Sequence, residues 1–285
     1  TSTFRAYLVQ NNEVSDTIET KDGMKFVKSH LFEKTLLNLI DRWLDNDKIT
    51  EILASGMVGS KQGWEEAPYQ KTPCNLKSLN YITPSLKDNR ISLKIFSGVC
   101  QINQPDVMRG EETQIAGFLN ENPNFNGSIC LPGTHSKWVE IKNNNIVKFK
   151  TFMTGELFEI ISKNSVLIHS IKAEKIDKME LLKSVDKILQ KPELFSNALF
   201  QLRADDLINS KGPLIYKSRL SGYLLAIELL GSVEFWKNSD IVLIGNPDLT
   251  SMYQFVLNKK VKSIKKFLSR DMILKGLKNF KKNLQ

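Results

Sequence analysis

The segment Cys130-Leu131-Pro132-Gly133-Thr134-His135-Ser136-Lys137-Trp138 has the pattern of a strand, a tight turn and a second strand. An apolar run ends at the Pro-Gly pair, and the residues that follow alternate as in a strand. Gly133 would let a ligand approach the backbone closely, and the turn's N–H groups, with the hydroxyls of Thr134 and Ser136, suit phosphate oxygens. Most Pro-Gly-Thr turns are only hairpin connections, so on this segment alone the plain connection is the more common explanation and phosphate binding is the alternative.

The composition is that of a globular protein, with 41% hydrophobic and 25% charged residues among 285. This length suffices for one large or two ordinary domains. The net charge of +9 results from 40 Lys and Arg against 31 Asp and Glu, and the excess is concentrated between Lys259 and Lys282. These Lys residues are interleaved with apolar residues at helical spacing and lack an aromatic stacking pattern, so a solvated face is expected, and no nucleic-acid site. A basic surface could also steer an anionic substrate.

Cysteine usage and hydropathy bear on the compartment. Cys74, Cys100 and Cys130 lie far apart without metal-ligand spacing, which favours a reducing cytoplasm. No secretory signal is recognisable, and no apolar run reaches the roughly 18 to 20 residues that span a bilayer. We therefore expect a soluble cytoplasmic protein that does not bind membranes. The chain starts at Thr1 inside a strand-like pattern, so we also expect a few residues to precede this sequence.

Strands and helices alternate along the chain. The periodicity and turn residues predict two α/β domains facing a cleft. The predicted elements are a hairpin over 4–20 turning at Asn11-Asn12, a helix over 31–45 capped by Ser29, strands over 49–54 and 91–96, a helix opening at 107–114, a strand over 146–152, a helix starting at Thr154, a mostly helical stretch over 173–234, a strand over 240–244, a helix capped by Thr250, and a last helix over 271–280.

Two further features are candidates for function. The loop Ser55-Gly56-Met57-Val58-Gly59-Ser60 follows a predicted strand, and such loops at the carboxyl edge of an α/β sheet commonly bind ligands, although an irregular connection is an equal alternative. Glu111 and Glu112 stand at a helix start. Carboxylates there usually complement the helix dipole, but one that faces a cleft is also a suitable general base.

Five motifs together resemble the 2-dehydro-3-deoxygalactonokinase family. They are Ser55 to Ser60 with Gly63-Trp64, Ala67-Pro68-Tyr69, Met108 to Gln114, Leu131 to Val139, and Met153 to Leu157, in the family's order and approximate spacing over nearly the whole chain. The resemblance implies the fold of the sugar kinase, actin and heat-shock chaperone ATPase superfamily. This is a two-domain actin-like ATPase (ribonuclease H-like) α/β fold with an interdomain cleft, comprising a sugar-binding domain over 1–125, on which 271–285 packs back, and an ATP-binding domain over 126–270.

The resemblance also implies roles for individual residues. Glu112 would be the general base that accepts the proton of the attacking hydroxyl, with Glu111 as the alternative. Arg109 would bind the substrate carboxylate, because a planar guanidinium pairs with it through two hydrogen bonds. The remaining sugar-pocket residues would be Gly56, Met57, Val58, Gly59, Ser60, Trp64, Tyr69 and, from the second domain, Glu156.

ATP would be held by two phosphate loops and an adenosine turn. Relatives start the first loop with an Asp, an aromatic residue and a Gly that this sequence does not contain; the Asp helps hold Mg²⁺ through water, so no metal ligand is assigned. His135 lacks a partner at triad spacing, which argues against a nucleophilic or metal role. The residues implied for ATP are Thr1, Ser2, Thr3 and Arg5 in the first loop, Gly133, Thr134, His135, Ser136 and Lys137 in the second, and Gly245 and Asn246 in the adenosine turn.

Three functional hypotheses follow. The first is an ATP- and Mg²⁺-dependent kinase that converts 2-dehydro-3-deoxy-D-galactonate to its 6-phosphate in galactonate breakdown. The second is a kinase of the same fold acting on another sugar or keto-deoxy sugar acid, and the third is a non-catalytic nucleotide-binding protein. A binding module needs no base, so the acidic pair favours the first two. The oligomeric state stays open, with a homodimer as one possibility.

Overall fold

The computed structural model describes residues 3–21, 23 and 26–284. The chain forms two compact units, of which unit 1 is Thr1–Asn122 with Met272–Gln285 and unit 2 is Pro123–Asp271. Unit 1 contains β1 (Phe4–Gln10), β2 (Glu13–Thr20), α1 (Phe32–Ile40), β3 (Thr50–Ala54), β4 (Gln70–Lys71), β5 (Cys74–Asn75), β6 (Tyr81–Ile82), β7 (Ile91–Phe96), β8 (Val99–Gln101), β9 (Asp106–Met108), α2 (Glu111–Glu121) and most of α9 (Ser269–Asn283).

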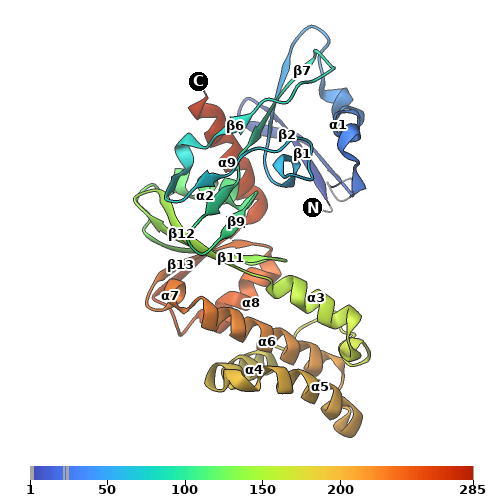
Figure 1. Cartoon of the computed structure of the whole chain (residues 1–285), viewed down its shortest axis with the longest axis vertical. Helices are drawn as coiled ribbons and strands as arrows, with labels where there is room; N and C mark the ends of the chain where they lie inside the picture. Colours follow the sequence, from blue (N-terminus) through green and yellow to red (C-terminus); the bar gives the residue numbers. More distant parts are fainter. Residues whose placement is uncertain (1–2, 22, 24–25, 285) are drawn as a thin grey trace. The chain divides into compact units, whose positions relative to one another are not determined.

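Unit 2 combines one sheet with a layer of helices. Helices α4 and α5 both pack on α6 (Figure 1). The elements are β10 (Gly127–Leu131), β11 (Ser136–Lys142), β12 (Asn145–Phe152), α3 (Thr154–Asn164), α4 (Lys178–Gln190), α5 (Phe195–Asn209), α6 (Pro213–Gly231), α7 (Val233–Trp236), β13 (Asp240–Gly245), α8 (Pro247–Leu257) and β14 (Ser263–Leu268).

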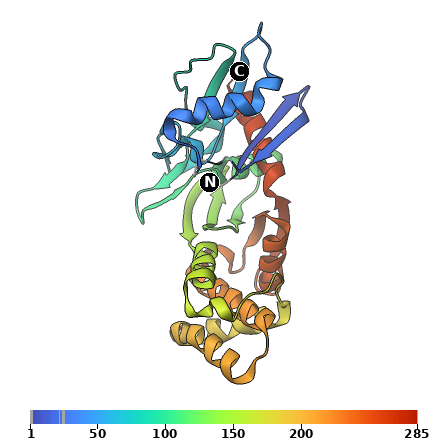
Figure 2. The same cartoon turned by 90° about the vertical axis from the view of Figure 1, so that its right-hand side faces the viewer.

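Two Asn-Asn pairs make the hairpin turns. Asn11 and Asn12 have φ angles of 50° and 65°, and Asn143 and Asn144 have 50° and 61°. Asn tolerates this left-handed region, and a pair of such residues matches the twist of antiparallel strands. The predicted hairpin over 4–20 is therefore confirmed as β1 and β2. Its apolar side chains pack with those of α1. Figure 2 shows the ribbons of the hairpin and of α1.

In the sheet of unit 2, the strands run in the order β12, β11, β10, β13, β14. The first three are antiparallel, whereas β13 runs parallel to β10 and β14 runs parallel to β13. Three antiparallel strands followed by two parallel ones is the ribonuclease H-like arrangement. Since β10 and β13 are parallel neighbours, the loops that leave their carboxyl ends emerge at the same edge of the sheet.

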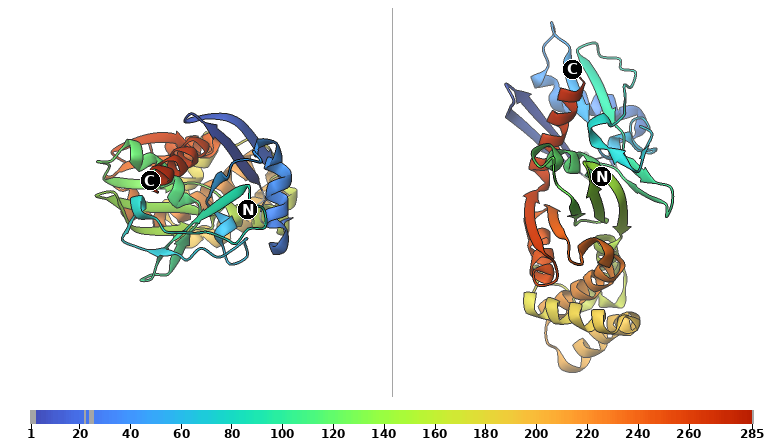
Figure 3. Two further views of the ribbon diagram at one scale, coloured as in Figure 1. Left: turned by 90° about the horizontal axis from the view of Figure 1, so that it is seen from above. Right: turned by 90° about the vertical axis from the view of Figure 1, so that its left-hand side faces the viewer.

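Helices α2 and α9 cross in direct backbone contact within unit 1. A Cβ placed on Gly117 would lie 2.0 Å from the Met272 carbonyl oxygen, and one on Gly276 would lie 2.0 Å from that of Thr113. Only glycine permits this approach. Lys278 of α9 also donates a hydrogen bond to the carbonyl of Asn12 in the β1–β2 turn. Figure 3 shows the β1–β2 hairpin next to α9. The segment after Met272 thus fixes the helix that starts at the acidic pair.

Three predictions of local structure are wrong. Helix α1 has Leu31 at its cap position, because residues 29–31 form a separate 3-10 turn. Asn246, not Thr250, caps α8, and the Thr250 hydroxyl instead bonds to the Asn246 carbonyl inside the helix. Residues 263–268, in the region where Lys and apolar residues alternate at helical spacing, instead form the edge strand β14, whose exposed Lys residues suit a sheet edge.

Candidate active site

The start of α2 places a completely buried carboxylate. Both oxygens of Glu112 accept from the Gly110 N–H, at 2.9 and 2.7 Å, and one also accepts from the Thr113 hydroxyl at 3.1 Å. Burial is the main cause that raises the pKa of Glu112 to about 8, and the nearby Glu111 adds to it, while these hydrogen bonds oppose the rise. The pKa of this carboxyl thus lies well above the ordinary value of 4.5 and close to neutral pH.

Glu111 lies beside Glu112 but is only partly buried. Its carboxylate accepts from the Arg109 N–H at 3.0 Å. Each of the two acids thus binds one backbone N–H just upstream of the helix, which is the capping role that carboxylates at a helix start commonly play. Burial distinguishes the two acids, because Glu112 is completely buried and has the raised pKa.

Arg109 lies two residues upstream of this pair and is 8% exposed. Its guanidinium donates to the Ala67 carbonyl at 2.7 Å and to the Tyr69 hydroxyl at 3.4 Å, and its Cζ lies 4.2 Å from the centre of the Tyr69 ring. The Nη1 atom is buried and has no hydrogen-bond partner among the described residues. A buried guanidinium with a spare donor attracts an anion, because an unpaired buried charge is costly.

The loop Gly56 to Ser60 passes close to Arg109 and Gly110. A Cβ on Gly59 would lie 3.0 Å from Arg109 Nη1, and one on Gly110 would lie 3.3 Å from the Gly56 Cα. Gly56 and Gly110 have φ angles of 89° and 106°, which L side chains rarely adopt. The structure therefore brings this loop together with Tyr69, Arg109 and the start of α2 within unit 1.

Other residues predicted for the sugar pocket serve packing. Trp64 stacks on Phe32, with ring centres 6.2 Å apart and planes 11° apart, and Val58 packs in an adjoining apolar cluster. The Ser60 hydroxyl donates to the Met57 carbonyl at 2.8 Å. These contacts shape the loop, and their role in binding stays a prediction.

In unit 2, the segment Cys130 to Trp138 forms the end of β10, a tight loop and the start of β11, as predicted. The buried Ser136 hydroxyl lies 3.1 Å from that of Tyr253 and accepts from the Gly133 N–H at 3.5 Å. Lys137 is also buried, at 4% exposure. Apart from Gly133 and its two chain neighbours, no described protein atom lies within 4 Å of a Cβ placed on Gly133, so open space faces that residue.

The start of α3 packs directly against this loop. The Glu156 N–H donates to the Thr134 carbonyl at 3.0 Å, and a Cβ on Gly155 would lie 2.5 Å from the Gly133 carbonyl oxygen. His135 and Glu156 form a half-exposed pair. The side chains predicted for phosphate and for sugar in this unit therefore bind each other.

The predicted adenosine turn lies next to the same loop. A Cβ on Gly245 would lie 3.5 Å from the Pro132 carbonyl oxygen. The Asn246 side chain accepts from the Asp248 N–H at 2.8 Å and so caps α8. Its oxygen is therefore used by the cap, so a nucleotide contact at this turn would use the amide N–H₂ group or the backbone.

The described residues of the predicted first phosphate loop, Thr3 and Arg5, show no arrangement typical of a phosphate site. Thr1 and Ser2 lie outside the described residues, and Thr3 is exposed. Arg5 pairs with Glu19 across the β1–β2 hairpin at 3.0 Å, and this partner raises the pKa of the guanidinium. Across residues 3–21, 23 and 26–284, no group of three His, Cys, Asp or Glu is placed to hold a metal ion.

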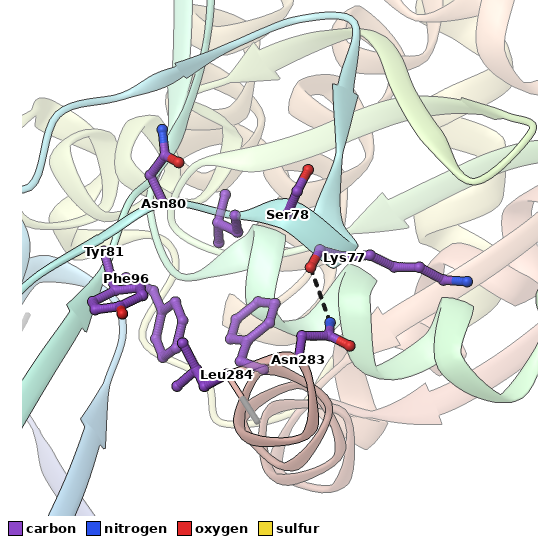
Figure 4. A pocket seen from close by; sticks show the side chains of 9 residues that line it. Lys77, Ser78, Asn80, Tyr81, Phe96, Asn283 and Leu284 are labelled. Atoms are coloured by element: carbon purple, nitrogen blue, oxygen red, sulfur yellow. Dashed lines mark hydrogen bonds between the residues drawn. The ribbon is translucent and has the colours of Figure 1, made fainter.

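A cavity of about 300 Å³ in unit 1 is formed by other residues. Figure 4 shows the rings of Tyr81 and Phe96 on one side and Asn283, which donates to the Lys77 carbonyl at 3.0 Å, on the other. None of the predicted site residues lines it.

Sequence reasoning missed Glu228. This residue of α6 is 1% exposed, and its carboxylate accepts from Trp138 Nε1 at 2.8 Å, from the Tyr253 hydroxyl at 2.8 Å and from the Thr154 hydroxyl. Burial raises its pKa, while the hydrogen bonds from Thr154, Trp138 and Tyr253 oppose the rise. An acid in an otherwise apolar stretch, Tyr223 to Leu230, was the available signal.

Comparison with known proteins places the chain among carbohydrate kinases. The model of the 2-keto-3-deoxy-galactonokinase family matches residues 1–280. The chain is 32% identical over 232 residues to a "Probable 2-dehydro-3-deoxygalactonokinase" of Rhizobium meliloti (strain 1021), covering 79% of this chain and 76% of the relative. It is 27% identical over 253 residues to the 2-dehydro-3-deoxygalactonokinase of Escherichia coli (strain K12), covering 88% and 84%.

A solved structure agrees. The crystal structure of a "putative 2-dehydro-3-deoxygalactonokinase protein from Sinorhizobium meliloti" superimposes with a TM-score of 0.91 at 27% identity, covering 99% of this chain and 96% of the other. The chain belongs to the 2-keto-3-deoxy-galactonokinase family. The predicted family and the α/β fold shared with this relative are confirmed. No helix in the described part of the chain has the length and apolar content needed to cross a membrane.

Proposed function

We propose that the protein transfers the γ-phosphoryl group of ATP to the terminal hydroxyl of 2-dehydro-3-deoxy-D-galactonate and forms the 6-phosphate, in the cytoplasmic breakdown of galactonate. The observation that carries this proposal is the pair formed by Arg109 and Glu112. One is a buried cation with a spare donor, and the other is a buried carboxylate with a pKa of about 8. A sugar acid needs both, because its carboxylate must be bound and its hydroxyl must lose a proton.

In this mechanism, Glu112 accepts the hydroxyl proton as the oxygen attacks the γ-phosphorus. Arg109 orients the substrate by its carboxylate, at the far end from the reacting hydroxyl. The loop of Gly133 to Lys137 binds the ATP phosphates, with the Gly245 turn beside it for the adenosine. Phosphoryl transfer requires the groups of unit 1 and unit 2 to act on the same pair of substrates, and closure around them would exclude water.

Mg²⁺ belongs to the proposal because of the family resemblance. It would neutralise charge on the transferred phosphoryl group, and ATP oxygens would supply most of its ligands. We assign it no ligand from the described residues, since no three-member cluster of suitable side chains is found among them.

The test is a coupled assay of ADP release over a panel of keto-deoxy sugar acids. We expect turnover with 2-dehydro-3-deoxy-D-galactonate to exceed that with its stereoisomers and with acids that lack the terminal hydroxyl. Faster turnover of another panel member would favour the second hypothesis, a kinase of the same fold with a different substrate. Absence of turnover with every acid would refute both kinase assignments.

Arg109→Lys should raise the KM for the sugar acid by about tenfold or more and change the KM for ATP little. Lysine keeps the charge but loses the planar fork that stacks on Tyr69 and reaches the Ala67 carbonyl. Steady-state kinetics with each substrate varied in turn would measure this. Arg90→Lys is the matched control, because Arg90 is a half-buried arginine of the same unit that pairs with Asp88. Equal changes in both KM values would contradict substrate binding by Arg109.

A further inference from the structure

Glu228 lies outside every residue predicted to bind a substrate, yet its contacts converge on the phosphate loop. Side chains from three elements bond to its carboxylate, namely Trp138 and Ser136 of β11, Thr154 of α3 and Tyr253 of α8. Two of these elements, β11 and α3, begin at or beside the loop. A carboxylate is thus placed where side chains from both flanks of the loop meet.

The contacts on the β11 side link the loop to Glu228 through two hydroxyls. The Tyr253 hydroxyl bonds to Glu228 at 2.8 Å, and the Ser136 hydroxyl lies 3.1 Å from that of Tyr253 and also bonds to Glu228. The Ser136 oxygen then accepts from the Gly133 N–H at 3.5 Å. A relay of hydrogen bonds therefore runs from the loop backbone to Ser136, and from Ser136 to Glu228 both directly and through Tyr253.

The contact on the α3 side fixes the other flank. Thr154, the first residue of α3, donates its hydroxyl to the same Glu228 oxygen that Tyr253 contacts. Two residues later, the Glu156 N–H holds the Thr134 carbonyl. The loop is therefore held near Gly133 by the relay and at Thr134 by a helix whose start is bound to Glu228.

A purely structural role is the alternative. Burying a carboxylate is costly, and an apolar side chain of similar size would fill the same space without that penalty. The simplest explanation for the hydrogen-bond donors around Glu228 is that they orient the loop of Gly133 to Lys137.

We propose that Glu228 is a positioning residue, which acts through Tyr253, Ser136 and Thr154 to hold the loop of Gly133 to Lys137 in the conformation that binds the ATP phosphates. This inference rests on the proposed function, which assigns that loop to ATP. It assigns no contact between Glu228 and the nucleotide itself.

The sharpest test removes one hydroxyl. Tyr253→Phe cuts the branch of the relay that runs through Tyr253 and leaves Glu228 and the ring in place. Tyr216→Phe is the matched control, because Tyr216 is a buried tyrosine of α6 whose hydroxyl accepts only from the Lys211 N–H at 3.0 Å, as far as the described residues show. Calorimetric binding of ATP and hydrogen exchange of residues 131–137 are measured for both variants and for Glu228→Gln. Neither readout needs turnover of the sugar acid.

We expect Tyr253→Phe and Glu228→Gln to weaken ATP binding about tenfold and to speed exchange in the loop, whereas Tyr216→Phe does neither. Thermal unfolding of all three variants identifies losses that come from general destabilisation. Wild-type ATP affinity and loop exchange in both Tyr253→Phe and Glu228→Gln would overturn the inference, even if the enzyme is a kinase. Weakened binding in the relay variants without any turnover of sugar acids by the wild type would refute the proposed function and leave the inference standing.

Discussion

Glu112→Gln lowers kcat for sugar-acid phosphorylation by about 10²- to 10⁴-fold and leaves ATP binding nearly unchanged, if Glu112 is the base. Glutamine fits the same space. Its carbonyl can accept from the Gly110 N–H, and its amide can donate to the Thr113 hydroxyl, so the start of α2 is kept. The measurement is ADP release together with calorimetric ATP binding. Glu111→Gln is the matched control, and a greater loss in that variant would reverse the assignment.

The pH profile provides a second measurement of the same residue. With a pKa of about 8 in the folded protein, Glu112 is mostly protonated below that pH. We therefore expect kcat/KM for the sugar acid to rise about tenfold per pH unit below pH 8 and to level off above it. A profile that is flat from pH 6 to 9 would exclude a base with this pKa.

The contribution of Glu112 to folding stability should fall as the pH rises, whereas the activity rises. The carboxyl has an ordinary pKa of 4.5 and a folded-state pKa of about 8, so between these values the folded protein binds more protons than the unfolded chain. Stability contributed by the protonated group is complete below pH 4.5 and is lost as the pH rises toward 8. Glu112→Gln removes this loss, and we expect it to raise the melting temperature more at pH 8 than at pH 5. Equal effects at both pH values would contradict the raised pKa.

Gly155→Ala should weaken ATP binding about tenfold or more and lower the free energy of unfolding by about 1–3 kcal/mol. The added methyl would lie 2.5 Å from the Gly133 carbonyl oxygen and 2.8 Å from the Thr134 Cα. Both are backbone atoms, so the phosphate loop or the start of α3 must move. Calorimetric ATP binding and denaturant unfolding measure the two effects.

Gly133→Ala is the informative partner of that variant. Its methyl would meet no described protein atom within 4 Å apart from those of residue 133 and its two chain neighbours, so we expect the free energy of unfolding to stay within about 0.5 kcal/mol of the wild type. ATP binding should still weaken, because the methyl occupies space proposed for phosphate. Wild-type affinity in Gly133→Ala would indicate that the nucleotide does not approach this residue.

Local sequence signals predicted much of the fold. Paired Asn residues marked both hairpin turns, and the Pro-Gly break marked the loop between β10 and β11. The missed cap of α8 was also readable, because Asn246 stands directly before a proline that occupies the first helical turn. Residues 263–268 were ambiguous, since mixed Lys and apolar residues fit both a helix face and an exposed edge strand.

The predicted site depended more on the family motifs than on residue patterns. Composition and spacing alone left Glu111 and Glu112 equivalent, and burial separated them. The Glu228 cluster was beyond local reasoning, because its members Trp138, Thr154 and Tyr253 are distant in sequence and meet only when the helices pack on the sheet. Asn246 and Arg5, both predicted to face ATP, instead make local contacts, the first in the cap of α8 and the second across the β1–β2 hairpin.

The composition of unit 1 has a consequence for biosynthesis. This unit needs α9, whose Gly276 lies against Thr113 of α2, whereas unit 2 is formed by one continuous stretch of chain. A ribosome delivers residues in order, and domains fold when their contacts become available. Unit 2 can therefore fold while synthesis continues, but unit 1 must wait for its last helix. The N-terminal half of the protein is the later one to mature.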